Sequence, residues 1–276
     1  MMHQSLFHHR GLWIGAVIIG LMVIVAGLSV MPWMPDPTII RVAEKLRSPS
    51  LEHWLGTDQL GRDLLGLTMR GAIASLLVAV GAVALGAGIG VPLGLVASAH
   101  ENAVSQIIMR MNDFIFAFPA LVIAILLHDT VGAGMQNAIL AIGIFNVPVF
   151  ARVVYNKSQS IWTLDFIQAA RLIGRSDINI ALLHVLPLAL GTIIVQITIQ
   201  LGLGILAEAG LSYVGLGVTP PTPSWGRMLN EAQTLIGLAP RLALVPGLAI
   251  ALAVLGFTLL GDALSEWIDP RKRTSG

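Results

Sequence analysis

The stretch from residue 165 to residue 187 reads Asp-Phe-Ile-Gln-Ala-Ala-Arg-Leu-Ile-Gly-Arg-Ser-Asp-Ile-Asn-Ile-Ala-Leu-Leu-His-Val-Leu-Pro. The residue types predict a short helix over 168–173 that Gly174 ends, because glycine commonly follows the last turn of a helix. Ser176 or Asp177 can cap a second helix. The stretch therefore predicts a helix–turn–helix, which could dock into a cleft on a partner protein. On these rules alone, an ordinary interhelical loop is an equally good interpretation.

The composition places the chain in a membrane. It has 276 residues, of which 55% are hydrophobic and 11% are charged, whereas an average soluble domain carries about 25% charge. The mean hydropathy is +0.82. So much apolar surface must face lipid. A net charge of +1 argues against nucleic-acid binding, and the absence of cysteine excludes disulfides, thiolate metal sites and cysteine nucleophiles.

Six apolar runs have the length of a membrane span, which needs about 20 residues. They predict an all-α, polytopic membrane protein with six transmembrane helices. Prolines inside these runs are tolerable, because neighbouring helices can satisfy the freed carbonyl groups. The basic cluster Arg271–Lys272–Arg273 close after the last run predicts that both termini are cytoplasmic. The six runs are residues 12–31, 72–97, 107–127, 133–150, 188–208 and 242–264.

Residues 165–187 resemble the coupling signature of ABC importer permeases, which is Glu-Ala-Ala, three residues, Gly, nine residues, Ile, one residue and Leu-Pro. This sequence departs from the signature at Gln168, which replaces the Glu, and at His184, which replaces the Ile. The resemblance implies that the loop inserts into a groove on the ATPase subunit. The matching positions are Gln168, Ala169, Ala170, Gly174, Leu186 and Pro187.

Three further segments resemble the second permease subunit of the dipeptide, oligopeptide and nickel branch of these importers. They are residues 53–63, 211–226 and 261–270, so the resemblance covers nearly the whole chain. It implies a type I ABC importer permease fold and a substrate among peptides, nickel and metal chelates. The short segment before the first span resembles the nickel-type members slightly more than the peptide members.

The resemblance also implies the assembly. The chain is expected to supply half of a translocation path in the prokaryotic inner membrane, in a heterodimer with a homologous permease subunit. Two ATP-binding subunits and an extracytoplasmic substrate-binding protein complete the expected set of partners. The expected division is an N-terminal helix and outer loop (1–70), a core (71–264) with a cytoplasmic coupling loop (151–187), and a cytoplasmic tail (265–276).

Catalysis is expected on other chains. The sequence contains no G-x-x-x-x-G-K-[ST] phosphate-binding loop, so ATP and magnesium are expected on partner subunits. We therefore expect no cofactor on this chain and no enzymatic activity of its own. The alternative is a secondary transporter or channel subunit that is not driven by ATP, which would not need a cytoplasmic docking loop.

Polar residues in the fifth span are candidates for lining the translocation path. Gln196, Gln200 and Glu208 recur at multiples of four residues, so neighbours share a face while the full set spirals around the helix. The alternative is that they join helices by hydrogen bonds worth about 0.6 kcal/mol each. Glu208, near the outer end, could also reach water or cap the following loop.

Outer segments contain turn residues and histidines. Residues 56–58 and 61–63 predict tight turns whose aspartates cap helix starts, and the Gly- and Pro-rich run 215–223 predicts a non-helical outer loop.

His53, His128 and Asp129 lie on the outer side, where a transition metal would arrive. One histidine with one aspartate makes a poor metal site, so no metal ligands are assigned.

Overall fold

The computed structural model describes residues 2–32, 34–99 and 102–268, and most of these residues are helical. No β-strand occurs in the described ranges, which confirms the all-α prediction. Short 3-10 turns cover Val42–Glu44 and Gln233–Leu235, and a π-helical turn covers Ala181–Val185. The α-helices are α1 Met2–Leu28, α2 Leu64–Ala99, α3 Ala103–Phe116, α4 Ala120–Val131, α5 Met135–Trp162, α6 Asp165–Leu172, α7 Asp177–Ile180, α8 Leu186–Tyr213, α9 Trp225–Ala232 and α10 Arg241–Ile268.

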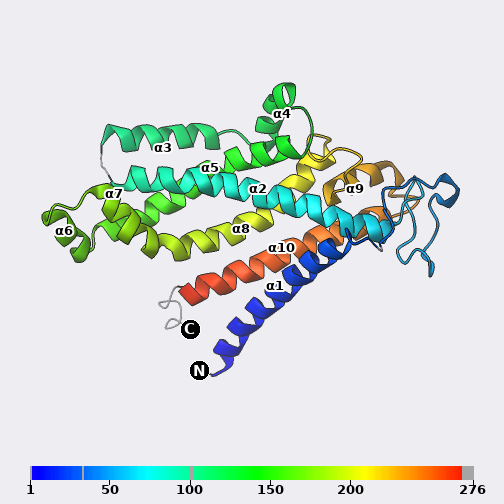
Figure 1. The fold of residues 1–276 in the computed structure, drawn as a ribbon, viewed down its shortest axis with the longest axis horizontal. Helices are drawn as coiled ribbons and strands as arrows, with labels where there is room; N and C mark the ends of the chain where they lie inside the picture. The colour runs from blue at the N-terminus through cyan, green and yellow to red at the C-terminus, as the bar shows by residue number, and fades with distance from the viewer. Residues whose placement is uncertain (1, 33, 100–101, 269–276) are drawn as a thin grey trace.

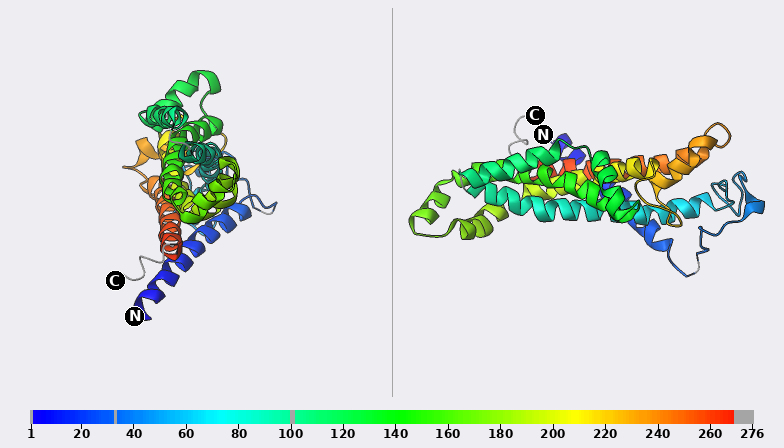
Figure 2. Two further views of the ribbon diagram at one scale, coloured as in Figure 1. Left: turned by 90° about the vertical axis from the view of Figure 1, so that its left-hand side faces the viewer. Right: turned by 90° about the horizontal axis from the view of Figure 1, so that it is seen from above.

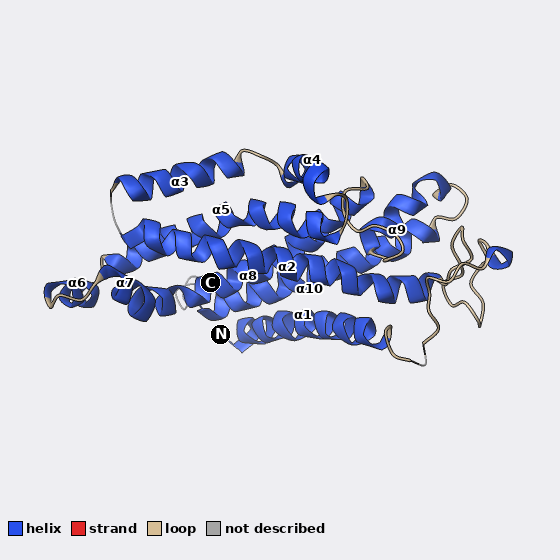
Figure 3. Ribbon diagram, turned by 45° about the horizontal axis from the view of Figure 1, so that its top comes forward, coloured by secondary structure: helices blue, strands red, loops and turns tan. Residues whose placement is uncertain are grey.

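Five helical segments of the described chain are long and apolar enough to cross a membrane. They are Arg10–Leu28, α2, α5, the continuous run Asp177–Tyr213, and α10. Helices α3 and α4 pass the same test together, but they are bent by 86° at a short break (Figure 3). The prediction of six spans is met when this bent pair is counted as one broken span.

The break corrects the prediction of a continuous third helix over 107–127. It falls at Pro119, whose ring removes a backbone donor and disfavours helical geometry at the preceding Phe118. Pro119 itself is extended, with ψ at 147°, and α4 begins after it. Asn137 of α5 fixes the new direction, because its side-chain amide donates to the carbonyl oxygen of Ala124 at 3.1 Å.

Other boundaries also differ from the sequence prediction. Helix α2 begins eight residues before the predicted residue 72, at Leu64, and α5 extends past residue 150 to Trp162, so the start of the predicted coupling loop is helical. Helix α9 was not predicted at all. The basic cluster 271–273 and most of the predicted tail lie outside the described residues.

The long helices run roughly side by side, and the short elements gather at the two ends (Figure 1). Helices α6 and α7 lie at one end, while α9 and the segment between α1 and α2 lie at the other. Helix α1 lies along α10 at the edge of the bundle, away from α3 and α4 (Figure 2). We call the end that carries α9 the outer end.

Among the described residues, α2 and α5 have the most extensive contact of any helix pair, and it runs along glycines spaced four residues apart. A Cβ atom on Gly86 would lie 2.4 Å from the Cβ of Asn146. One on Gly90 would lie 2.4 Å from the carbonyl oxygen of Val147, and one on Gly94 would lie 2.5 Å from that of Ala151. Small residues at this spacing let two membrane helices touch backbone to backbone.

Helix α1 turns a wide apolar surface outward. Trp13, Val17, Leu21 and Ile24 are each more than half exposed, although all are apolar. Its contact with α10 uses Gly15, where a Cβ would lie 2.8 Å from the carbonyl oxygen of Gly256. A helix with this exposure suits a lipid boundary.

The glycine contact generates a prediction about stability. Gly90→Val should weaken the packing of α2 on α5 by about 1–3 kcal/mol, the usual cost of overfilling a packed site. Gly88→Val is the matched control, because nothing lies within 4 Å of a Cβ at Gly88. The measurement is the thermal midpoint of the purified protein in detergent. Equal midpoints for the two variants would contradict this account of the helix pair.

Candidate functional site

The stretch 165–187 forms the predicted helix–turn–helix at the end of the molecule opposite α9. Gly174 has a φ of +82°, where side chains are strained. Its amide donates to the carbonyl oxygen of Arg171 at 3.0 Å, and the Arg175 amide donates to that of Ala170 at 3.2 Å. This pair of bonds is a Schellman motif, so Gly174 ends α6 as predicted.

The second helix begins at the predicted cap. The Ser176 hydroxyl accepts a hydrogen bond from the Asn179 amide at 3.4 Å, so Ser176 is the N-cap of α7. The chain then passes through the π-helical turn without a loop and continues as α8 from Leu186, with Pro187 in the first turn. Proline at 187 cannot donate to the preceding turn of this continuous run, and the π-helical turn directly before it is where the α-helical pattern is interrupted.

The helix–turn–helix is anchored to the core by one buried face. Ile167 and Ile180 are fully buried, and they pack in one cluster with Leu95 of α2 and Val154 and Trp162 of α5. A fully buried aliphatic side chain contributes about 1.5–3 kcal/mol. The segment is therefore mounted on the ends of α2 and α5.

Arg171 adds a polar anchor on the same side. Its guanidinium lies 4.6 Å from the ring centroid of Trp162 and donates to the carbonyl oxygen of Ala99 at 3.1 Å. It also pairs with Asp177 at 2.9 Å, which joins α6 to α7. The Trp162 indole nitrogen in turn donates to the Ser98 hydroxyl at 3.1 Å. These contacts tie both short helices to α2 and α5.

The two departures from the coupling signature have structural consequences. The Gln168 side-chain amide donates to the carbonyl oxygen of Trp162 at 2.7 Å, and a carboxylate at this position could not donate that bond. The His184 ring meets the Phe166 ring edge to face, with centroids 6.2 Å apart. Gln168 therefore bonds α6 to the end of α5, and His184 packs against α6. Ala169 is exposed and Ala170 is buried.

The tip of the helix–turn–helix is apolar and uncovered. Leu172 is 89% exposed, Ile173 76% and Ile178 71%. Contiguous exposed apolar side chains mark interaction sites in proteins. The tip lies beyond the ends of the long helices (Figure 1), so it is placed for a partner outside the bundle.

The structure separates the three path candidates on α8. Glu208 is fully buried, so the expectation that it reaches water is wrong. Gln200 is also buried within the chain, while Gln196 is half-buried. They do not form one cluster, because the four-residue repeat drifts by about 40° per step. The path role of these residues stays a prediction.

Glu208 instead holds the outer loop to the core. Its carboxylate accepts hydrogen bonds from Ser212 at 2.6 Å and Ser75 at 2.8 Å, and Ser224 also bonds to it. The Ser75 hydroxyl accepts from the Trp225 amide at 3.3 Å. One buried carboxylate thus joins α2, α8 and the start of α9. Capping of the following loop, one alternative from the sequence, is confirmed by the bonds to Ser212 and Ser224, whereas the bond to Ser75 of α2 had no local sequence signal.

The predicted turns of the outer loop are confirmed. Gly56 and Gly61 have positive φ angles of 80° and 75°. The Asp63 carboxylate caps α2 by accepting from the Gly66 amide at 2.7 Å. Asp58 instead closes its own turn, accepting from the Leu60 amide at 2.8 Å.

Arg62 ties this loop to α9, a contact that the sequence did not predict. Its guanidinium pairs with Asp58 at 2.6 Å and with Glu231 at 2.5 Å. Burial alone would lower the pKa of Arg62, but the two carboxylates outweigh it and raise the pKa above its ordinary value. The outer loop and α9 therefore share one ion-pair network.

His53 belongs to the outer loop and has acidic neighbours. Its Nδ1 lies 3.0 Å from Asp63 and its Nε2 lies 3.5 Å from Glu44. In the described part of the chain, no three His, Cys, Asp or Glu side chains are grouped as metal ligands. His128 and Asp129 lie exposed near the end of α4.

The fold is similar to that of solved importer permeases. The chain is similar to a chain of the inward-facing MetNI methionine ABC transporter, with a TM-score of 0.63 and 20% identity, over 74% of this chain and 96% of that one. A second crystal form of the same transporter gives a TM-score of 0.62 at 21% identity. The chain therefore has the type I ABC importer permease fold.

Sequence comparison identifies the family. Residues 90–274 match the binding-protein-dependent transport system inner membrane component family. The chain is 46% identical over 223 residues to the glutathione transport system permease protein GsiD of Escherichia coli O6:K15:H31, covering 81% of this chain and 74% of the relative. It is 42% identical over 226 residues to GsiD of Pectobacterium atrosepticum, covering 82% and 75%. The chain belongs to this family and is a permease subunit of an ABC importer.

The Glu208 cluster generates a prediction about the outer loop. Glu208→Ala should destabilise the protein by about 1–3 kcal/mol, because it leaves buried hydroxyl groups without their acceptor. It should also speed tryptic cleavage at Arg227 in the neighbouring α9. Glu52→Ala is the control, since Glu52 is exposed. The account fails if both variants match the wild type in thermal midpoint and cleavage rate.

Proposed function

We propose that this chain forms half of the translocation path of an importer for short peptides of the glutathione kind. We also propose that residues 165–187 couple it to a separate ATPase subunit. The names of the relatives support the substrate class, because both are glutathione permeases and both cover most of this chain. Nickel and metal chelates are the second candidate substrates. Their only support is the resemblance of the sequence to the branch of importers that carries dipeptides, oligopeptides and nickel.

One observation carries the coupling proposal. An exposed apolar tip, Leu172 and Ile173, stands on a segment whose other face is buried against α2 and α5. An ATPase subunit that covers this tip would gain apolar contact, and its movement would be passed to the buried face. The ends of α2 and α5 would then move with it. The coupling residues in this proposal are Gln168, Ala169, Ala170, Gly174, Leu186 and Pro187.

The proposed assembly contains four kinds of chain. This subunit pairs with a homologous permease, two ATP-binding subunits hold magnesium ATP at the cytoplasmic end, and an extracytoplasmic binding protein delivers the substrate at the outer end. Both termini are then cytoplasmic. The chain itself hydrolyses nothing. The working division remains 1–70, the core 71–264 and the tail 265–276, with Gln196 and Gln200 as path candidates within the core.

The coupling proposal predicts a defect at the turn. Gly174→Val should uncouple the transporter, because a β-branched side chain at positive φ costs about 1–2 kcal/mol and opens the end of α6. Substrate-stimulated ATP hydrolysis by the complete transporter should fall, while the permease still inserts and folds. Gly174→Asn is the matched control, since asparagine tolerates this conformation. Normal stimulated hydrolysis in Gly174→Val would overturn the coupling assignment.

The substrate proposal predicts selective uptake. Proteoliposomes with the complete transporter, ATP inside and the binding protein outside should accumulate labelled glutathione. Unlabelled short peptides should compete, and a nickel chelate should not. Uptake of nickel without uptake of glutathione would favour the second candidate and reject the first.

A further inference from the structure

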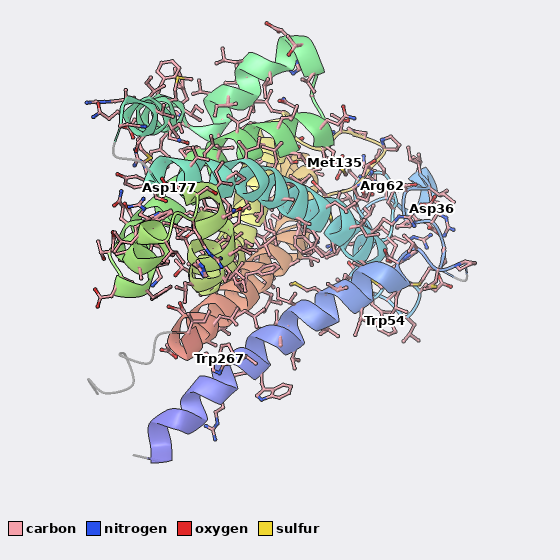
Figure 4. All side chains as sticks on the ribbon, turned by 60° about the vertical axis from the view of Figure 1, so that its left-hand side comes forward. Asp36, Trp54, Arg62, Met135, Asp177 and Trp267 are labelled. Carbon is pink, nitrogen blue, oxygen red and sulfur yellow. The ribbon has the colours of Figure 1, made fainter. Side chains whose placement is uncertain are left out.

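A hollow of about 380 Å³ opens at the outer end of the molecule, opposite the helix–turn–helix. Its walls come from four regions that are distant in the sequence: the first outer loop, the outer part of α2, the start of α5, and the loop before α9. Figure 4 shows Asp36 and Met135, two of its lining residues, at the end away from Asp177. Small-molecule sites commonly occupy about 300–1,000 Å³.

The hollow presents one anion. Asp36 is exposed, and its Oδ1 accepts hydrogen bonds from the Thr38 amide at 2.9 Å and the Thr38 hydroxyl at 2.8 Å. The bond from the Thr38 amide lowers the pKa of Asp36, so the carboxylate is charged at neutral pH. Within the described residues its Oδ2 accepts no hydrogen bond, and it remains available to a ligand.

The hollow also presents one cation. Arg70, on α2, donates one hydrogen bond through its guanidinium, to the carbonyl oxygen of Ser29 at 3.0 Å. Its other N–H groups donate to no acceptor among the described residues. Arginine is always charged and matches the planar geometry of a carboxylate. This bond also fixes the guanidinium beside the hollow.

Apolar side chains line the hollow together with the two charges. Arg70, Ile73 and Leu77 share one face of α2, because they are spaced three and four residues apart. Met135 adds to this lining from α5. Pro221 and Pro223 form the opposite rim, where proline limits backbone freedom. The hollow therefore combines fixed opposite charges with a short apolar surface.

We propose that this hollow is a receiving site for a short zwitterionic peptide, in which Arg70 binds a carboxylate and Asp36 binds the ammonium group. The peptide side chains lie against Leu77 and Met135. This inference rests on the proposed function, since it names where the peptide first meets the permease. Binding there is weak, because a substrate that must move on has to leave the site as readily as it enters.

The test measures direct binding with a matched pair of variants. Leu77→Trp fills the hollow, whereas Val80→Trp lies about one turn deeper on α2 and outside the lining. The two side chains are similarly exposed, at 53% and 52%. Purified complete transporter, without binding protein, is placed in phosphatidylcholine nanodiscs and titrated with isotopically labelled glutathione.

Wild type and Val80→Trp should bind saturably and alike, and Leu77→Trp should weaken binding by about tenfold or more, which is about 1.4 kcal/mol. Asp36→Asn should also weaken binding of glutathione but not of its N-acetylated form, which lacks the ammonium group. This variant leaves the Arg70 bond to Ser29 in place. Equal binding by Leu77→Trp and Val80→Trp, or no saturable binding, would overturn the receiving site.

A lipid headgroup offers the same chemistry, because phosphatidylethanolamine carries an ammonium group and an anion. A second set of nanodiscs that contain this lipid separates the two sources. Binding of glutathione should persist in them. If that lipid abolishes it, the hollow is a headgroup site and the peptide inference is wrong.

Measurements of glutathione uptake distinguish failure of the receiving site from failure of the proposed function. If the wild-type transporter imports glutathione and Leu77→Trp binds and imports it as Val80→Trp does, the receiving site is rejected while peptide import stands. If the wild type neither binds nor imports any short peptide, both fail.

Discussion

The close contact between α2 and α5 is the constraint on which the rest of the structure depends. Gly86, Gly90 and Gly94 bring the two backbones together over about two turns, and no side chain larger than hydrogen fits at these positions without a shift. Without a hydrophobic force between helices in lipid, such close packing is a main source of their association. The contact makes α2 and α5 one unit that runs from the outer end to the opposite end.

Both ends of this unit carry an exposed feature suited to a partner. At one end, Trp162 and Leu95 hold the helix–turn–helix, whose far side is an apolar tip. At the outer end, Ser75 of α2 bonds to Glu208 and so fixes the segment that leads into α9. The hollow with Arg70 lies beside this junction. Under the proposed coupling, a movement of the tip would be passed along α2 and α5 to the outer end.

Helix caps and turns could be predicted from the sequence, because they depend on residues that are close together in the chain. Gly174, Ser176 and Pro187 have the predicted places in the helix–turn–helix. Pro92 and Pro148 lie inside unbroken helices while Pro119 divides a span, and local sequence does not distinguish them. Neighbouring helices decide which freed carbonyls are satisfied. The burial of Glu208 was missed for the same reason, since its partners come from distant segments.

The central proposal for this protein is that an ATPase subunit covers the tip of the helix–turn–helix. A photo-crosslinking amino acid in place of Leu172 tests this directly in the complete transporter in native membranes. The same amino acid in place of Leu238 is the control, because Leu238 is 72% exposed but lies at the outer end of the molecule, just before α10. The account predicts a crosslink to the ATPase subunit from position 172 and none from position 238. Crosslinks from position 172 to lipid alone, with the transporter active, would contradict it.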